Sequence, residues 1–279
     1  PDAPVVRQGK MEPRARYRNH RVVDDAHGVI TAMETTPGDV EENAKLTALV
    51  DQHQANTQTS VKTVVADSQY GTTENFRACA ERGIRSHMAD LKEKQTNSGR
   101  REGIFGESAF RYDEATDTYR CPAGGILKRR KHKKNRKAYE YAAGVAVCRA
   151  CPLRDQCTRS SMGRTIKRHE GHEAIQAARD QAHSRMAKKD RAKRKWLMEK
   201  SFADAANNHH FKRSRWRRLW RQQIQDYMIG AVQNVRILAR HLNRGPLAAQ
   251  AAVSFTRVAT FFIERIRPGA WNRLFAPVF

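Results

Sequence analysis

Two acidic residues lie in settings that favour chemistry. Asp67 directly follows the apolar segment 61–66, and Glu199 falls in a stretch where Trp196 and Phe202 recur at helical spacing. A carboxylate in an apolar face loses hydration and needs a base, a hydrogen-bond donor or a metal ion as partner. Together the two acids could hold Mg²⁺ for phosphodiester cleavage. A plain turn at Asp67 and an ion-paired surface position at Glu199 remain as alternatives.

Four of the five cysteines gather in one segment. Cys148, Cys151 and Cys157 follow the spacing Cys-x₂-Cys-x₅-Cys, and Cys121 precedes them, which offers four thiolates for one tetrahedral zinc ion. Zinc ribbons carry two cysteines in each limb, whereas the first limb here has one. A zinc site and reduced thiols that pack a small subdomain are therefore equally supported. Cys79 lies apart from this group and is expected in the core.

Positive charge dominates the composition. The 279 residues include 53 Lys and Arg against 29 Asp and Glu, for a net charge of +24. Such a charge indicates a polyanionic partner. Nucleic acid is the first candidate and a membrane surface is the second. No apolar run is long and uninterrupted enough to cross a bilayer. The basic run 128–137 could be a solvated loop, but the cationic context favours phosphate contact. The residues expected to contact DNA are Lys128, Arg129, Arg130, Lys131, Lys133, Lys134, Lys195, Lys212, Arg213, Arg215, Arg217 and Arg218.

The first ninety residues predict a mixed sheet with helices on its faces. Two strands joined by a turn precede a helix, a strand, a second helix and a last short strand. Gly28 is expected at the positive-φ position of the turn, and Asp39 as the N-cap of the first helix. In this order the elements occupy residues 17–24, 29–36, 39–50, 61–66, 73–82 and 84–88.

The remaining chain changes character twice. Residues 92–101 predict a polar linker, and residues 110–120 a hairpin that leads into the cysteine segment. Helical periodicity returns near Ala174 and continues through Glu199. A further helix is expected over 222–242, with a buried stripe of Ile224, Met228, Ala231, Val235, Leu238 and Leu242.

These motifs together resemble bacterial insertion-sequence transposases of the DDE, ribonuclease H-like class, in the branch with a cysteine-bearing insertion before the catalytic glutamate. The second-Asp motif of that family resembles Val-Val-Ala-Asp-Ser-Gln-Tyr at 64–70. Its glutamate motif resembles residues 196–205, and the helix that ends its catalytic domain resembles residues 233–238. The cysteine-bearing insertion resembles residues 121–157.

The resemblance implies an α/β fold, with a ribonuclease H-like mixed sheet interrupted by a basic cysteine-containing subdomain. Residues 1–90 would form the first part of the catalytic core and residues 91–185 the insertion. Residues 186–243 would supply the glutamate helix and the closing helices, and residues 244–279 a tail helix.

The implied activity is metal-dependent strand cleavage and strand transfer at the ends of an insertion element. Asp67 and Glu199 would be the second and third acidic ligands of Mg²⁺ or Mn²⁺, with two ions in the site. The partners would be element-end and target DNA, bound by a homodimer in the bacterial cytoplasm and associated with the nucleoid. A non-enzymatic DNA-binding remnant and another ribonuclease H-like nuclease are the alternatives.

The family's first acid lies on an opening strand, which is expected to be missing ahead of Pro1. The early stand-ins are Asp2, Asp24 and Asp25, of which the last two fall in the predicted turn. The sequence also departs from the family in the loop after the second Asp, where Ser-Gln-Tyr replaces the usual Lys-Gly-Tyr.

Overall fold

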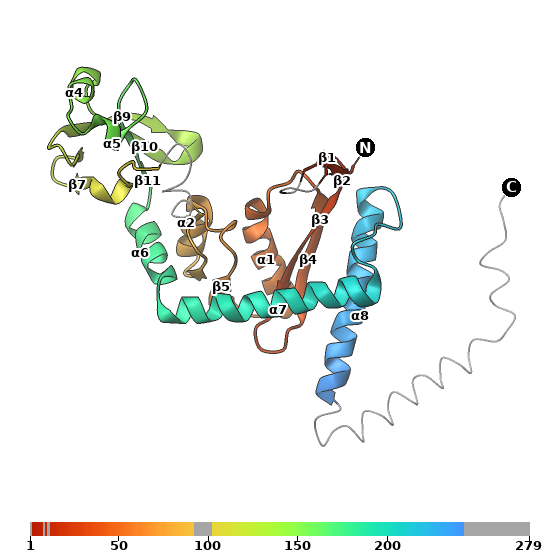
Figure 1. Ribbon diagram of the computed structural model, residues 1–279. Coiled ribbons are helices and arrows are strands. Elements are labelled where there is room, and N and C mark those ends of the chain that lie inside the picture. The colour runs from red at the N-terminus through yellow and green to blue at the C-terminus, as the bar shows by residue number, and fades with distance from the viewer. Residues whose placement is uncertain (1, 8, 10–11, 92–101, 243–279) are drawn as a thin grey trace, which may run out of the picture.

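The computed structural model describes residues 2–7, 9, 12–91 and 102–242 (Figure 1). The predicted linker 92–101 and the tail 244–279 lie outside these residues. In the described part of the chain, no helix is both long and apolar enough to cross a membrane.

The N-terminal elements follow the predicted order, after a short pair of strands, β1 (Val5–Val6) and β2 (Arg14–Ala15). Gly28 takes the expected positive φ of 76° in the first turn. The next elements are β3 (Tyr17–Val23), β4 (Ile30–Pro37), the 3₁₀ helix η1 (Glu42–Lys45), α1 (Leu46–Thr57), β5 (Thr63–Val65), α2 (Thr73–Glu81) and β6 (Arg85–His87).

The first helix begins later than predicted. Asp39 does not cap it, because η1 precedes α1 and neither helix receives a side-chain hydrogen bond at its N-cap, Glu41 or Lys45. The second helix has the expected kind of cap, since the Thr72 hydroxyl accepts a hydrogen bond from the Asn75 amide.

The described strands do not join in the single mixed sheet expected from the sequence. β3 and β4 form an antiparallel pair, β5 and β6 form a parallel pair, and no ladder connects the two pairs. Helix α1 packs against β4, and its Leu46 and Val50 share a core with Phe76 and Met88. The two strand pairs are therefore joined through helix packing.

The middle of the chain forms a five-stranded antiparallel sheet in the order β11-β10-β9-β8-β7. The hairpin predicted over 110–120 is confirmed, whereas the other three strands were not predicted. The elements of this middle part of the chain are η3 (Glu107–Ala109), β7 (Arg111–Asp113), β8 (Thr118–Arg120), β9 (Ile126–Lys133), η4 (Lys134–Arg136), β10 (Ala138–Ala142), α4 (Val145–Arg149), α5 (Arg154–Cys157) and β11 (Thr165–His169).

The basic run is thus a strand and a short helix, not a loop. Leu127 of β9 is buried with Phe110, Tyr119, Tyr141 and Ile166, and most other side chains of this strand are exposed. The one buried apolar position of β9 fixes the face that packs inward, while the cations face water.

Three helices complete the described chain: α6 (His172–Ala182), α7 (Arg185–His209) and α8 (Leu219–Leu242). Figure 1 shows α7 crossing the lower part of the β3–β4 hairpin as it runs from α6 to α8. The buried stripe predicted for α8 is wrong, because Ile224, Met228, Val235, Leu238 and Leu242 are exposed.

A different face of α8 packs against β4. It carries Gly230, where an added Cβ would lie 2.7 Å from Cε of Met33. It also carries the buried Asp226 and Gln233, which find hydrogen-bond partners on β4 and α7, and the buried Gln222, which donates to Asp226 of the same helix. Close approach and polar pairing therefore decide this interface, which hydrophobic periodicity alone could not predict.

Candidate functional site

Helix α7 is the element around which the candidate site is built. Side chains along one side of it reach the strand pairs: Asp190 lies 2.7 Å from Nδ1 of the buried His87 on β6. Ser201 accepts a hydrogen bond of 3.0 Å from Arg21 of β3. Ala187 and Ala205 are buried, and small side chains there let the helix approach closely.

Asp67 reaches this helix across the fold. Its Oδ2 lies 3.6 Å from the guanidinium of Arg194, and its Oδ1 accepts a 2.9 Å hydrogen bond from the amide of Gln69. The next turn is tightly packed, because an added Cβ at Gly71 would lie 1.9 Å from the carbonyl oxygen of Ala89. Asp67 is therefore both a turn residue and a partner of α7, with its side chain 41% exposed.

Glu199 is not buried in an apolar face, contrary to the sequence prediction. Its side chain is 68% exposed and lies 3.9 Å from Nζ of Lys195, while Trp196 is 59% exposed. Five residues separate Arg194 from Glu199, which on an α-helix is a rise of about 7.5 Å and a rotation of roughly 140°. The fold brings Asp67 to the helix that carries Glu199, but the two acids face different sides of it.

The early acids have local roles. Asp24 accepts hydrogen bonds from the amides of Ala26, His27 and Val29, which closes the turn between β3 and β4. Asp25 pairs with Lys193 of α7 at 3.1 Å. Asp2 accepts a hydrogen bond from the amide of Leu219, the first residue of α8.

The carboxylates in this conformation do not fit a shared metal site. Asp67 is paired with Arg194 and Glu199 with Lys195, so each already faces a cation. Across the described ranges, no three His, Cys, Asp or Glu side chains form a group that could hold a metal ion.

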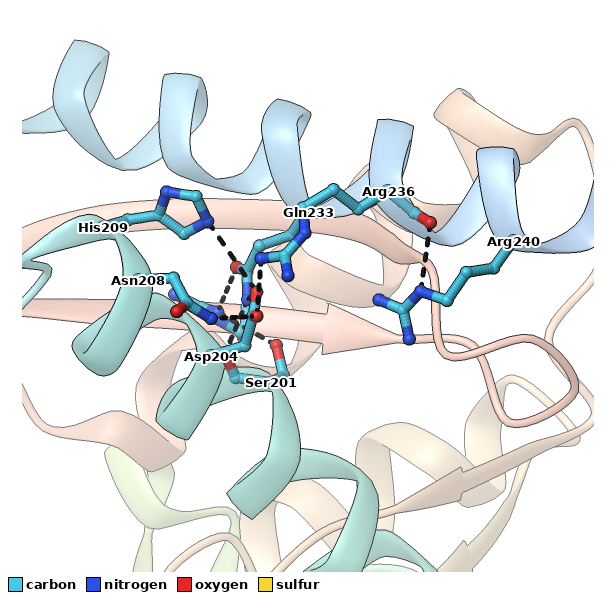
Figure 2. A network of polar contacts seen from close by, with 8 residues as sticks. Ser201, Asp204, Asn208, His209, Gln233, Arg236 and Arg240 are labelled. Carbon is cyan, nitrogen blue, oxygen red and sulfur yellow. Dashed lines mark hydrogen bonds and ion pairs between the residues drawn. The ribbon is translucent and has the colours of Figure 1, made fainter.

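Asp204 lies five residues beyond Glu199 and forms a network that sequence reasoning missed (Figure 2). It accepts hydrogen bonds from Gln233 at 2.9 Å, Asn208 at 2.8 Å and Arg236 at 2.8 Å, and His209 lies 3.9 Å away. Burial alone would raise the pKa of Asp204, but these partners together lower it. The network fixes the end of α7 against α8. The only signal in the sequence is an acid within an alanine-rich turn.

Arg21 ties the same two helices to β3. It donates to Ser201 and to Gln233, and it lies over the ring of Phe202 at 4.2 Å. Burial lowers the pKa of Arg21 to about 10, although Asp226 opposes that shift. The side chain remains a cation at neutral pH and cross-links the core.

A cleft of about 710 Å³ lies between the first hairpin turn, α7 and α8. Its lining includes the exposed Trp196, and Lys200 sits over that ring at 4.8 Å. Further cations in the lining are Lys193, Arg236 and Arg240. A cationic cleft with an exposed aromatic plane suits a nucleic-acid backbone and an unstacked base.

The cations predicted to contact DNA lie in three places. Lys195 is on the exposed side of α7, and a second set is on β9 and η4: Lys128, Arg129, Arg130, Lys131, Lys133 and Lys134. The third set lies between α7 and α8 and is exposed: Lys212, Arg213, Arg215, Arg217 and Arg218.

Backbone hydrogen bonds to the side chain of Gln225 hold the segment between α7 and α8 against α8. The carbonyl of Arg213 accepts a hydrogen bond from Gln225, and the amide of Arg215 donates to the same side chain. Trp216 of this segment and Trp220 of α8 are exposed. Gln225 thus fixes this segment while leaving its cationic side chains in solvent.

The four clustered cysteines come together at one end of the five-stranded sheet. Cys121, Cys148, Cys151 and Cys157 line one pocket of about 180 Å³, and none forms a disulfide. Cys79 is buried in the separate core of α1 and α2, as expected.

Strands β9 to β11, the four clustered cysteines, Glu199 and most of α8 fall within one segment that is similar to a known family. Residues 120–239 match the family model described as the transposase DDE domain. This domain is of the polynucleotidyl transferase class and implies transposase function and DNA binding, and DDE transposases typically use divalent metal ions. Asp67 lies outside the matched residues. No curated protein and no solved structure matches the chain.

Proposed function

We propose that this protein is a DNA transposase that cleaves strands at the ends of an insertion element and joins them to target DNA. The observation that carries the proposal is the match of residues 120–239 to the transposase DDE domain, because this segment includes Glu199 and both large cationic surfaces. The contact between Asp67 and Arg194 adds support, since it joins the second acidic motif to the glutamate helix.

Asp67 and Glu199 are the proposed acidic pair, with two Mg²⁺ or Mn²⁺ ions as the proposed cofactor. Hard carboxylate oxygens suit such ions. In the conformation described here the two acids are apart, so their joint role requires them to approach each other when DNA is bound.

The proposed organisation keeps the domain limits expected from the sequence. Residues 1–90 and 186–243 would make a ribonuclease H-like core, with 91–185 inserted as a DNA-binding unit and 244–279 as a tail. Two element ends must be held at once during transposition, which supports a homodimer on DNA. We place the protein in the bacterial cytoplasm, associated with the nucleoid.

An assay for cleavage and joining tests the activity. The full chain is incubated with supercoiled plasmid and an end-labelled duplex, with Mg²⁺ or Mn²⁺ present or chelated. Metal-dependent nicking together with covalent transfer of label to the plasmid supports the transposase. Nicking without transfer indicates a nuclease, and salt-sensitive binding with neither reaction indicates a DNA-binding remnant.

Variants of the two acids test the site. Asp67→Asn and Glu199→Gln should each abolish nicking and joining while DNA binding persists. The matched control is Asp51→Asn, which also loses an exposed ion pair, with Arg82, away from α7. Because Glu199 is mostly exposed, its substitution should change the free energy of unfolding by less than about 0.5 kcal/mol. Full activity of Glu199→Gln would refute its role.

A further inference from the structure

We propose that Cys121, Cys148, Cys151 and Cys157 bind one structural zinc ion that holds the cysteine end of the five-stranded sheet together. The proposal is independent of the acids on α7 and concerns a site about which the family match says nothing.

The four thiols converge from separate elements on one cavity. Cys121 directly follows β8, Cys148 lies in α4, Cys151 lies just beyond α4, and Cys157 ends α5. All four line the same pocket of about 180 Å³, and Phe110 contributes to its wall. A tetrahedral zinc site needs four thiolates at about 2.3 Å from the ion, and this pocket supplies that number of sulfurs.

The backbone around two of these sulfurs is shaped to admit them. An added Cβ at Gly125 would lie 3.2 Å from Sγ of Cys121, and one at Gly163 would lie 2.9 Å from Sγ of Cys148. The turn after β8 is closed by hydrogen bonds between Cys121 and both Gly124 and Gly125, each of 2.9 Å. Glycines at these two positions leave room for the sulfurs where any side chain would crowd them.

Zinc binds cysteine as the thiolate, and one ion would neutralise half of the combined charge of four thiolates. Arg164 hydrogen-bonds the carbonyl of Cys157 at 3.3 Å and so places a compensating cation beside the cluster.

The segment that carries three of the cysteines reaches the core through Cys148 and Cys157, which pack against the buried cluster that includes Leu127 and Ile166. In residues 144–165 no apolar side chain is buried, and Val147 and Met162 are exposed. Its two helices, α4 and α5, have five and four residues. Helices this short are unstable alone, and small units with few buried side chains usually need a metal or a disulfide. Among the described residues the sulfurs are not yet arranged as a metal site, so binding would draw them inward.

Metal content of the full chain tests the proposal. Protein purified without added metal and under reducing conditions should contain about one zinc per chain by mass spectrometry of the metal. Replacement by Co²⁺ should give the visible absorption of tetrahedral thiolate coordination. Serine substitution at each of the four cysteines should reduce the zinc content, whereas Cys79→Ser, a buried cysteine in the other core, should leave it unchanged.

A second measurement does not depend on whether the cysteine variants fold. Limited proteolysis of the unaltered chain should show new cleavage within residues 144–165 after chelation, and zinc should reverse it. Absence of bound zinc and of a cobalt spectrum in the folded, reduced chain would overturn the proposal and leave the thiols as packing groups. Neither readout depends on DNA cleavage, so the transposase proposal can fail while the zinc site stands.

Discussion

The carboxylate of Asp67 lies 3.6 Å from the guanidinium of Arg194, so a loop at the end of β5 contacts the helix that carries Glu199. This ion pair would act in two ways on the metal binding proposed for Asp67. It orients the carboxylate, and it competes with any divalent ion for the same oxygen.

The first prediction concerns that competition. Arg194→Gln should lower the Mg²⁺ concentration that gives half-maximal nicking, because the carboxylate loses a competing cation. Partly exposed ion pairs contribute up to about 1 kcal/mol, so the change should not exceed roughly fivefold. Lys193→Gln, which removes the neighbouring pair with Asp25, should leave the Mg²⁺ requirement unchanged. A higher requirement in Arg194→Gln would mean that orientation outweighs competition.

The second prediction concerns the buried acid of α8. Asp226 accepts hydrogen bonds from Asn19 at 3.0 Å, Thr35 at 2.6 Å and Gln222 at 2.8 Å. Asp226→Ala leaves three donors without this acceptor, two of them on the buried Thr35 and Gln222, and should reduce the free energy of unfolding by about 3 kcal/mol, measured by chemical denaturation. The control Arg221→Ala changes an exposed residue of the same helix and should have an effect below about 0.5 kcal/mol. Equal effects would contradict the role of the network.

The third prediction concerns the cations of β9. Lys128, Arg130 and Lys131 are exposed and pair with no acid in the described part of the chain. Substituting all three by Gln should weaken DNA binding and make its dependence on salt shallower, by a logarithmic slope of up to about three.

The control for this surface changes two cations of β9 that already form ion pairs with acids. Arg129 lies 3.1 Å from Asp117 and Lys133 lies 3.0 Å from Glu140. The double Gln variant at these two positions should change the salt slope less per residue. A triple variant that binds with an unaltered slope would place the DNA elsewhere.

The fourth prediction concerns pH. Burial lowers the pKa of His20, whose Nε2 lies 2.9 Å from the Thr36 hydroxyl; Glu34 opposes this shift, while Lys45 adds to it. Below about pH 6.5 the unfolded chain binds a proton that the folded chain resists, so stability present above that pH is lost as pH falls.

Denaturation curves at several pH values check this sign. His20→Asn should flatten the loss of stability between about pH 7.5 and pH 5.5. The exposed His241→Asn should keep the original slope. Some slope should remain in the first variant, because burial also lowers the pKa of His172. An unchanged slope in His20→Asn would refute the prediction.

Local patterns predicted the elements of the N-terminal half well. The turn at Gly28 and the strand before Asp67 were recognised because each depends on neighbouring residues only. Packing choices were harder to predict. The inward face of α8 is defined by Gly230 and by polar residues whose partners lie far away in the chain. Cationic strand β9 was missed because its one buried residue, Leu127, gives no visible alternation.

The candidate site was predicted only in part. The sequence identified Asp67 and Glu199 as acids of interest, and the fold brings Asp67 to α7. The sequence could not predict the orientation of Glu199, because Trp196, the largest apolar residue near it, is exposed and does not mark an inward face. Asp204, whose partners lie on both α7 and α8, could not be distinguished from a surface acid.

Helix α7 is a single unbroken rod of 25 residues, about 37 Å long, that begins beside α6 and ends against α8. One residue inserted between Asp190 and Glu199 would turn everything beyond it by about 100°. The length of this helix can therefore change only in steps near whole turns, and relatives that differ in length here should differ by about seven or eleven residues.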